Sequence, residues 1–443
     1  MLLVNPWIHD FAAYNLWARP MGLLVLGTRL RRLGWEPQLL DFLDPSDPDA
    51  PRPKPMAHGK FHRTVIPKPE PLQDIPRRLS RYGLSPAVID RELRSLPTPA
   101  AILITGVMTY WYTGLQETVR VLRDAFPGVP LLLGGVYATL MPEHARRSCD
   151  VDMVWEGPGE QELSEMLYRV TGLRPSGGEA DSDLEFTPAL DLLRRVEFMP
   201  LLTSRGCPMK CAYCASRRLV SGFVQRPPRL VIDEIAKGVA NYGITDVALY
   251  DDAFLIQRAQ HALPLLRGVA ERIPGLRWHS PNGLHAAAID LEVAQAMKKT
   301  GFKTIRLGLE SSSDAFHERT GHKTTRMAFL TAVGNLREAG FSREDIGAYL
   351  LVGFPGQSRE AIEGDVELVL RAGAVPKLAE YSPIPGTALW DAAVKTSRYP
   401  IQDEPLYQNC TLLSCAEPEV DWVFLQRTRS RIRGALPDPA GAR

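Results

Sequence analysis

Three cysteines stand close together near the middle of this chain, in a spacing that suits metal binding. Cys207, Cys211 and Cys214 follow an apolar, strand-like segment at residues 199–203. Three thiolates can hold three irons of a 4Fe–4S cluster, which four cysteines normally hold. The remaining iron then stays open to a ligand from outside the protein. Such an iron can bind a second molecule and pass one electron to it, so the spacing predicts redox chemistry.

Two simpler interpretations of the three cysteines stay open. Positions i, i+4 and i+7 also share one face of a helix, although Gly206 and Pro208 favour a loop around Cys207. The second alternative is a zinc site of three thiolates completed by a distant histidine. Zinc sites more often combine two Cys-x2-Cys pairs, and Cys211 with Cys214 is the single such pair in the sequence. The iron–sulfur cluster is therefore the favoured interpretation.

The cysteine run resembles the signature of the radical S-adenosylmethionine (radical SAM) superfamily, in which an aromatic residue, here Tyr213, precedes the last cysteine. Five later segments resemble, in order, the ends of the second to sixth strands of that family's barrel. This resemblance extends over residues 197–392 and implies a partial (βα)6 radical SAM barrel. The five segments are ALYDDAF at 248–254, SPNGLH at 280–285, RLGLES at 306–311, LLVGFPGQ at 350–357 and YSPIPGT at 381–387.

The apolar pattern over 197–392 independently indicates repeated strand–helix units. Short apolar runs alternate with amphipathic stretches, as in a parallel sheet covered by helices. A helix is predicted over residues 230–242, with apolar residues at four-residue spacing, and another over 291–301, ended by Gly301. Polar, glycine and proline residues follow the predicted strands, where ligands bind in parallel α/β folds.

The resemblance also implies a set of S-adenosylmethionine contacts at these strand ends. Asp251 and Asp252 stand where the family reads the methionine amine, with a helix N-cap as the alternative for both. His285 could contact a ligand or only orient a neighbouring side chain, and no residue stands out as a catalytic acid or base. The implied SAM-binding residues are Tyr213, whose main chain is expected near the adenine, Asp251, Asp252, Asn282 and Glu310 for the ribose or carboxylate side, and Gly353 and Phe354 against the adenine.

The N-terminal part indicates a second α/β domain. Continuous apolar runs that end in small residues are typical of buried parallel strands, and amphipathic stretches between them fit crossover helices. The pattern predicts a flavodoxin-like (Rossmann-type) doubly wound domain, whose ligands lie at the carboxyl ends of the strands. Strands are predicted at 1–6, 101–106 and 130–135, and helices at 21–33 and 116–126.

This part resembles the cobalamin-binding domain found ahead of many radical SAM barrels. The resemblance is carried by RPMGLL at 19–24, GVMTYW at 106–111, GGVYAT at 134–139 and EGPGE at 156–160. Because glycine has no Cβ, its backbone can approach a bulky ligand closely, although a plain turn is the alternative for the glycine pair. The implied cobalamin-binding residues are Gly106, Met108, Thr109, Trp111, Gly134, Gly135, Val136, Tyr137, Glu156 and Gly157.

The sequence departs from some cobalamin domains in one respect. Those domains supply a histidine to cobalt within the string Asp-x-His-x-x-Gly. No such string occurs in residues 1–200, and His9, His58, His62 and His144 are expected to be surface polar residues. The radical enzymes of the family commonly lack this histidine too. The sequence is then compatible with methyl chemistry at cobalt, and also with a vestigial domain that binds nothing.

Composition and charge limit which kinds of molecule the protein is expected to bind and in which compartment it is expected to work. The chain has 443 residues, 45% of them hydrophobic, and a formal charge of +1, which gives no basic field for nucleic acid. No apolar run approaches the roughly 18 residues of a membrane span, and no basic segment precedes the first strand, so no signal peptide is expected. A cytoplasmic protein with small-molecule or peptide substrates is predicted.

The remaining cysteines do not suggest a disulfide scaffold, since six in so long a chain are few. Cys149 is expected to be an isolated buried thiol. Cys410 and Cys415 are expected to be ordinary thiols, with a catalytic thiol as the minority alternative. The predicted organisation is a cobalamin-binding-like domain at 1–172 with a proline-rich surface insertion at 44–76, a linker at 173–196, the radical SAM barrel at 197–392, and an α-rich C-terminal cap and tail at 393–443.

The resemblance implies a radical SAM enzyme that uses a 4Fe–4S cluster to cleave S-adenosylmethionine to a 5′-deoxyadenosyl radical. With cobalamin as a further cofactor, the main interpretation is methyl transfer to an unactivated carbon of a small molecule or peptide. A one-electron reductant such as flavodoxin or ferredoxin is the implied partner. The alternatives are radical oxidation, cyclisation or rearrangement with a non-methylating or vestigial cobalamin domain, and a non-catalytic metal-binding protein.

Overall fold

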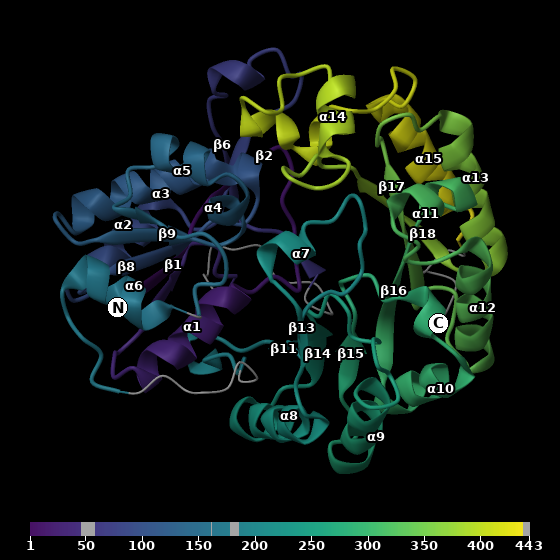
Figure 1. The fold of residues 1–443 in the computed structure, drawn as a ribbon, viewed down its shortest axis with the longest axis horizontal. Helices are drawn as coiled ribbons and strands as arrows, with labels where there is room; N and C mark the ends of the chain where they lie inside the picture. The colour runs from purple at the N-terminus through teal and green to yellow at the C-terminus, as the bar shows by residue number, and fades with distance from the viewer. Residues whose placement is uncertain (46–57, 161, 178–185, 437–443) are drawn as a thin grey trace. The chain divides into compact units, whose positions relative to one another are not determined.

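The computed structural model describes residues 1–45, 58–160, 162–177 and 186–436 (Figure 1). The chain divides into two compact units. Unit 1 comprises Met1–Glu197 together with the short segments Arg218–Val220 and Glu404–Leu406. Unit 2 comprises Phe198–Arg217, Ser221–Asp403 and Tyr407–Arg443. Within the described residues, no helix has both the length and the apolar character needed to cross a lipid bilayer.

Unit 1 is built on a five-stranded parallel sheet with the order β10-β9-β8-β1-β4. Numbered along the chain and taken from the opposite edge, this order is 2-1-3-4-5, the flavodoxin arrangement. The predicted doubly wound fold is therefore confirmed. The strands are β1 (Leu2–Asn5), β4 (Gln38–Asp41), β8 (Ile102–Thr105), β9 (Leu131–Gly134) and β10 (Met153–Val154).

Helices cover both faces of this sheet because alternate strand residues point to opposite sides. Leu2 and Val4 of β1 belong to one core cluster with residues of α2 and α3, whereas Leu3 belongs to another with residues of α1 and α6. Each face of the sheet thus has its own apolar layer. The helices are α1 (Met21–Arg32), α2 (Pro86–Ser95), α3 (Tyr112–Ala125), α4 (Val136–Leu140), α5 (Pro142–Ser148) and α6 (Leu163–Thr171), with a 3-10 turn η2 at Thr109–Trp111.

Part of the predicted proline-rich insertion is built into small antiparallel sheets. Strands β2 (Ile8–Asp10), β7 (Ser80–Tyr82) and β6 (Arg63–Val65) form one, and β3 (Asn15–Leu16) with β5 (His58–Gly59) forms the other. Phe61 from the insertion is buried. The three residues of β6 are exposed, so this part of the insertion lies at the surface while Phe61 packs inward. Residues 46–57 lie outside the described residues.

Unit 2 contains a six-stranded parallel sheet in sequence order, β11-β14-β15-β16-β17-β18. Helices follow the strands on the outside of the curved sheet, as expected for a partial (βα) barrel (Figure 1). The strands are β11 (Met199–Leu201), β14 (Asp246–Leu249), β15 (Arg277–His279), β16 (Phe302–Glu310), β17 (Ile346–Val352) and β18 (Val375–Glu380), and the helices are α8 (Pro228–Tyr242), α9 (Ala262–Arg272), α10 (Leu291–Thr300), α11 (Asp314–Thr320), α12 (Arg326–Glu338) and α13 (Arg359–Ala372).

The predicted helix ends in unit 2 are close to those observed. α10 ends at Thr300, and Gly301 follows with φ +99°. A Cβ at Gly301 would collide with the carbonyl oxygen of Leu276, so both the backbone conformation and the close approach require glycine there. The sequence signal at Gly301 therefore had a structural cause.

A short hairpin and a C-terminal segment belong to unit 2, apart from Arg218–Val220 and Glu404–Leu406 of unit 1. Strands β12 (Ser204–Gly206) and β13 (Phe223–Gln225) pair antiparallel, and the short helix α7 (Ser216–Leu219) lies between them. The predicted α-rich C-terminal segment is only partly helical, since 3-10 turns rather than α-helix lie between its two helices. These elements are α14 (Trp390–Thr396), η5 (Pro405–Gln408), η6 (Cys410–Leu412) and α15 (Trp422–Gly434). Residues 178–185 of the predicted linker and the tail 437–443 lie outside the described residues.

Candidate functional site

The three cysteines lie in a loop between β12 and α7. Residues 207–215 contain no helix, so the interpretation of three cysteines on one helical face is wrong. Gly206 enters the loop with φ +77°, a left-handed conformation that glycine adopts without strain. Backbone bonds fix the loop from both sides, because the amide of Ala212 donates to Thr320 O and its carbonyl accepts from the Leu389 amide, at 3.0 and 2.9 Å.

Aromatic packing holds the loop between its second and third cysteines. The ring of Tyr213 stacks on Phe316 with centroids 6.2 Å apart, and Phe316 contacts Phe354 at 4.8 Å. Tyr213 and Phe354 thus join the same apolar cluster, which also contains Tyr381. Tyr213 lines the cavity described next, whereas Phe354 does not. The structure therefore places Phe354 as support for the cysteine loop.

All three cysteines line one cavity of about 270 Å³ at the carboxyl edge of the unit 2 sheet. Within the described residues, no three His, Cys, Asp or Glu side chains come close enough to share one metal ion. In a tetrahedral zinc site the sulfurs lie about 3.8 Å apart, whereas in a 4Fe–4S cluster each thiolate binds a different iron. The residues that complete the lining include Met209, Ser216, Asp252, Ala253, Ile256, Pro281, Asn282, Gly283, His285, Lys323 and Tyr349.

Burial raises the pKa of both the Cys207 and Cys211 thiols, and the nearby ammonium of Lys323 acts in the opposite direction. Both thiols are therefore protonated at neutral pH in the metal-free chain. Since a thiol binds metal as thiolate, metal binding must release these protons. Cys214 is exposed.

Lys323 is a charged residue of the cavity lining that the sequence did not single out. Its Nζ lies 3.2 Å from Oε1 of Glu310. Burial, the largest single influence, lowers the pKa of Lys323, but the Glu310 carboxylate together with Cys211 and Cys214 outweighs it and raises the pKa above its ordinary value. A Cβ at Gly308 would overlap the Lys323 ammonium and lie 2.9 Å from Glu310 Oε1. Gly308 therefore leaves the space in which this ion pair sits.

Glu310 itself does not line the cavity but is joined to it through Lys323. Its backbone has φ +67°, a left-handed conformation that is uncommon outside glycine. Strain of this kind concentrates at functional sites. His285 also reaches Lys323, because its Nε2 bonds to the Lys323 carbonyl oxygen. Strand β16 and the loop after α11 are thus tied together at the cavity wall.

The two adjacent aspartates are in different environments. Asp251 is 4% exposed and does not line the cavity. Its carboxylate accepts hydrogen bonds from the Thr203 amide at 3.0 Å and the Thr203 hydroxyl at 2.7 Å, and another from the Ser204 hydroxyl. Asp252 lines the cavity instead, and burial raises the pKa of its carboxyl. The structure thus assigns Asp251 to holding the strand before the cysteine loop.

The helix N-cap alternative for the aspartates is wrong, since the next helix, α9, begins at Ala262. Of the other predicted SAM contacts, Asn282 lines the cavity and its Nδ2 donates to the Tyr250 carbonyl at 2.8 Å. Gly353 lies away from the cavity lining and has φ +79°. Its amide donates to the Gln357 side chain at 2.7 Å. Gly353 therefore forms a turn at the end of β17.

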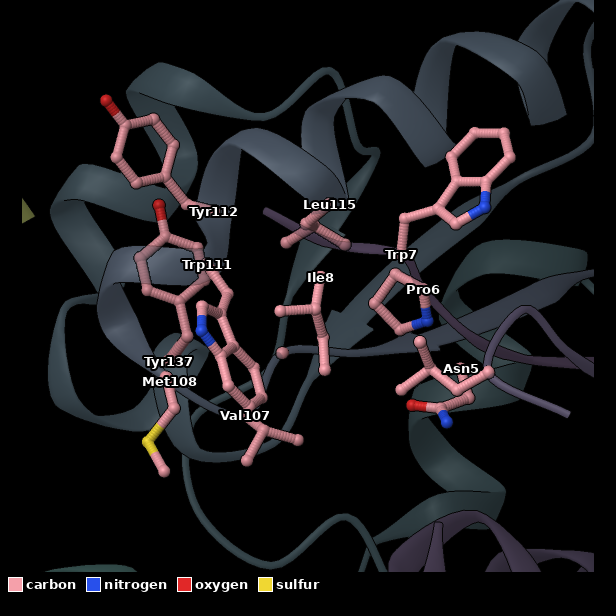
Figure 2. Close-up of a pocket in the computed structure, with 12 residues that line it drawn as sticks. Asn5, Pro6, Trp7, Ile8, Val107, Met108, Trp111, Tyr112, Leu115 and Tyr137 are labelled. Atoms are coloured by element: carbon pink, nitrogen blue, oxygen red, sulfur yellow. The ribbon is translucent and has the colours of Figure 1, made fainter. Parts of the chain in front are cut away.

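Unit 1 has a separate cavity of about 40 Å³, at the carboxyl ends of β1 and β8 (Figure 2). This is where the strand order reverses, the usual ligand position in doubly wound sheets. Its walls are mostly apolar. Four of the predicted cobalamin residues line it, namely Gly106, Met108, Trp111 and Tyr137, together with Asn5, Pro6, Trp7, Ile8, Leu43, Val107, Tyr112 and Leu115.

The remaining six predicted cobalamin residues do not line this cavity. The three glycines among them differ in the space around their backbones. A Cβ at Gly134 or Gly157 would meet no atom within 4 Å, so open space adjoins both backbones. A Cβ at Gly135 would lie 2.7 Å from Thr105 Oγ1, so packing requires glycine there. The others are Thr109, which is buried, Val136, which begins α4, and Glu156, which pairs with Arg146 at the surface.

Two histidines of unit 1 are not the surface residues that the sequence predicted. His9 is 8% exposed, and its Nε2 lies 2.8 Å from Glu117, which also pairs with Arg81. His144 is partly buried, and its Nδ1 lies 2.7 Å from the hydroxyl oxygen of Tyr137. Burial lowers the pKa of His144 to about 4, so its imidazole is neutral at pH 7 and engaged within the protein.

Comparison with known proteins agrees with this geometry. Residues 201–369 match the radical SAM superfamily. A cytidylyl-2-hydroxyethylphosphonate methyltransferase of Streptomyces wedmorensis is 19% identical over an alignment 480 positions long, gaps included, that covers 92% of this chain and 84% of the relative. An uncharacterized methyltransferase of Pyrococcus horikoshii is 24% identical over 330 aligned positions that cover 67% of this chain and 70% of the relative. An anaerobic magnesium-protoporphyrin IX monomethyl ester cyclase of Cereibacter sphaeroides is 25% identical over 308 aligned positions that cover 61% of this chain but only 49% of the cyclase.

Solved structures share the fold of the whole chain. The radical SAM methyltransferase TsrM from Kitasatospora setae, solved with tryptophan and a SAM analog, gives a TM-score of 0.67 at 17% identity over 99% of this chain and 89% of TsrM. The cobalamin-dependent radical enzyme OxsB gives 0.59 at 14% identity over 91% of this chain and 55% of OxsB. Residues 201–369 thus form a radical SAM domain, and the chain has the fold of the cobalamin-dependent radical SAM enzymes, as the sequence resemblance implied.

Proposed function

We propose that this chain is a cobalamin-dependent radical SAM methyltransferase whose 4Fe–4S cluster is held by Cys207, Cys211 and Cys214. The observation that carries the proposal is the cavity at the carboxyl edge of the sheet, where these thiols meet Asp252 and Lys323. When bound, the cluster supplies the electron that cleaves S-adenosylmethionine to methionine and a 5′-deoxyadenosyl radical. The protein binds the reactants, orients them and excludes water.

Side chains in the cavity match the charged groups of the methionine part of S-adenosylmethionine. Asp252 offers a carboxylate to the amine, and Lys323 offers an ammonium to the carboxylate. Asn282 donates through Nδ2 to Tyr250, which leaves its amide oxygen to accept a bond from a ribose hydroxyl. Gly353 and Phe354 support this site from outside the cavity, since they shape the strand end and the aromatic cluster.

We assign cobalamin to the carboxyl edge of the unit 1 sheet, where apolar side chains at the ends of β1 and β8 can pack against one face of the corrin ring. Val107 and Met108 are each 41% exposed after β8, so they form an apolar shelf beside the cavity. The open space at Gly134 and Gly157 lets a ligand approach the backbone. His144 is held by Tyr137, so it is not free to serve as a cobalt ligand. When bound, cobalamin supplies the methyl group for transfer to an unactivated carbon of a small molecule or peptide.

Anaerobic reconstitution with iron and sulfide tests the cluster. We expect about four irons per chain and the electron paramagnetic resonance signal of a reduced 4Fe–4S cluster. Single substitutions of Cys207, Cys211 and Cys214 by alanine should abolish both, while the matched control Cys149→Ala, at a buried thiol of unit 1, should retain them. Equal iron content in all four variants would contradict the proposal.

Product analysis after reduction with S-adenosylmethionine and hydroxocobalamin tests the reaction type. Bound cobalamin together with 5′-deoxyadenosine and S-adenosylhomocysteine supports methyl transfer. Formation of 5′-deoxyadenosine without cobalamin supports the alternative of radical oxidation, cyclisation or rearrangement. A zinc-loaded protein that forms neither product contradicts both.

A further inference from the structure

Two basic side chains lie on the inner face of the unit 2 sheet, which also carries Tyr349 of the cysteine cavity, although neither of them lines that cavity. Arg306 comes from β16 and Lys377 from β18, and both are partly buried. The register pairs Arg306 with Gly347 of β17, and Lys377 with Tyr349 two residues further on. Residues paired across neighbouring strands point to the same side of the sheet. Because Tyr349 lines the cysteine cavity, Arg306 and Lys377 belong to that same inner side.

Neither cation has an acidic partner among the described residues. Arg306 donates through Nη1 to the Ile305 carbonyl at 3.0 Å, and Lys377 makes no ion pair or side-chain hydrogen bond there. The carboxylates on the same two strands are engaged elsewhere, since Glu310 pairs with Lys323 and Glu380 with Arg429. The inner face therefore carries two uncompensated positive charges.

The packing around Arg306 reserves space for its guanidinium group. A Cβ at Gly347 would lie 2.9 Å from Cδ of Arg306 and 3.0 Å from its Nη1. Any larger residue at position 347 would therefore displace the guanidinium. Tyr349 is fixed beside the pair, because its hydroxyl donates to the Pro281 carbonyl at 2.7 Å.

Two unpaired cations at close quarters are unfavourable in the ligand-free chain. Burial lowers the pKa of Lys377, and the nearby guanidinium of Arg306 lowers it further. A buried charge without a partner is destabilising unless a bound group compensates it. A structural role would call for a carboxylate or carbonyl partner at each cation, and Lys377 has neither among the described residues.

We propose that Arg306 and Lys377 bind an anionic group of the substrate, a phosphate, phosphonate or carboxylate, and so hold the substrate inside the barrel beside the cysteine cavity. This proposal rests on the proposed function, and it specifies the substrate class. A guanidinium presents a planar pair of donors that matches carboxylate and phosphate oxygens, and the lysine adds a compact second charge. Two positive charges suit a doubly charged phosphate or phosphonate as well as a carboxylate.

Anion titration of the full chain, purified without its cofactors, tests this site. Inorganic phosphate and succinate are each titrated calorimetrically at tens of millimolar into the wild type, Arg306→Gln and Lys377→Gln. The control is Lys303→Gln, which removes an exposed lysine of the same strand β16. We expect at least one anion to bind the wild type and the control equally. Both test variants should bind it roughly tenfold to a hundredfold more weakly, because each loses charge-assisted hydrogen bonds.

A thermal readout separates binding from a structural role. If the two cations serve a ligand, Lys377→Met should melt at the same temperature as the wild type or higher, because an uncompensated buried charge is removed. The anion should raise the melting temperature of the wild type but not of Lys377→Met.

Which anion binds distinguishes a phosphorylated or phosphonate substrate from a carboxylate substrate. Phosphate alone points to a phosphorylated or phosphonate substrate, and succinate alone to a carboxylate. The proposal would be overturned if neither anion binds, if both test variants bind the anion as tightly as the wild type, or if Lys377→Met melts at a lower temperature and the anion has no effect on melting. Iron uptake by the wild type is measured separately, so failure of the cluster proposal is distinguished from failure of this one.

Discussion

The Nζ atom of Lys323 lies 3.2 Å from Oε1 of Glu310, and Gly308, two residues before Glu310 on β16, leaves the space for this pair. The pair joins the loop after α11 to the end of β16 at the wall of the cysteine cavity. It also places a positive charge beside the thiols, as the electrostatic link to Cys211 indicates.

Replacing Lys323 by methionine should weaken S-adenosylmethionine binding by roughly tenfold or more, because the ammonium is lost and Glu310 is left without its partner. The free energy of unfolding should also fall by about 1–3 kcal/mol, since both side chains are partly buried. Equilibrium dialysis and urea unfolding measure the two quantities. Lys303→Met is the control, and equal SAM affinity in both variants would argue against a role for Lys323 in binding.

Gly308→Ala should disturb ligand binding more than it disturbs stability. The added Cβ would overlap the ammonium of Lys323, which is the far end of a flexible side chain and can move away. The ion pair then shifts while the strand stays folded. Gly334→Ala in α12 is the matched control, because no atom lies within 4 Å of its added Cβ and alanine favours a helix by about 0.5–1 kcal/mol. We expect lower SAM affinity for Gly308→Ala alone.

Gly134→Leu should block cobalamin without unfolding unit 1. The added side chain enters open space, because a Cβ there meets no atom within 4 Å, and the backbone is not left-handed. The expected result is an unchanged melting temperature with loss of the cobalamin absorbance that co-elutes with the protein. If the cobalamin absorbance is undiminished, either cobalamin binds away from the end of β9 or the space beside Gly134 holds the leucine side chain and cobalamin together.

His261 should contribute an acid-sensitive part of the stability. It is 2% exposed, and burial, followed by the charge of Arg226, lowers its pKa from 6.5 to about 4. The folded protein keeps the imidazole neutral, whereas the unfolded chain binds a proton below pH 6.5. Its stabilising contribution is therefore complete above pH 6.5 and is lost as the pH falls towards 4, by up to about 3 kcal/mol.

His261→Gln removes this titration. Denaturant unfolding of both proteins at pH 7, 6, 5 and 4 measures the effect, and the difference in unfolding free energy between them should change across this window alone. A constant difference would mean that His261 keeps an ordinary pKa in the folded protein. The variant also loses the 2.8 Å bond between His261 Nε2 and the Thr203 hydroxyl. Because this bond is lost at every pH, it lowers the free energy of unfolding by a constant amount and does not change its pH dependence.

The thiols should react with iodoacetamide in an order set by exposure and pKa. Cys214 is exposed, whereas Cys149 and Cys415 are buried and burial raises the pKa of each to about 11. In the metal-free native chain at pH 8, Cys214 should be alkylated first, and the two buried thiols only on unfolding. Mass spectrometry of the digested protein gives the order. Early alkylation of Cys415 would revive the alternative of a catalytic thiol.

The fold could be predicted from the sequence because its signals are local. Apolar runs ending in small residues marked the parallel strands, and the cysteine loop was marked by Gly206 and Pro208. Gly301 marked a helix end because glycine readily adopts the left-handed conformation that follows the last turn of α10. Each signal depends on residues within a few positions of one another, so no tertiary information was needed.

The parts of the site that were missed depend on distant residues. Lys323 is significant only because Glu310 and Gly308 lie across from it. Asp251 and Asp252 are neighbours of the same type, and only the structure separates the one that faces the cavity from the one that bonds to Thr203. His9 was expected at the surface because its partner Glu117 is far along the chain.

The hydrogen bonds of the Asp251 carboxylate should help the cysteine loop keep its conformation when the protein is exposed to oxygen. It ties Thr203 and Ser204, at the start of the cysteine hairpin, to the end of β14 through bonds that involve no metal. The loop itself is fixed to Thr320 and Leu389 through the backbone of Ala212. If the proposed cluster is lost in air, these bonds should therefore leave the thiols in position, so that the same polypeptide can take up iron and sulfide again rather than being degraded and resynthesised.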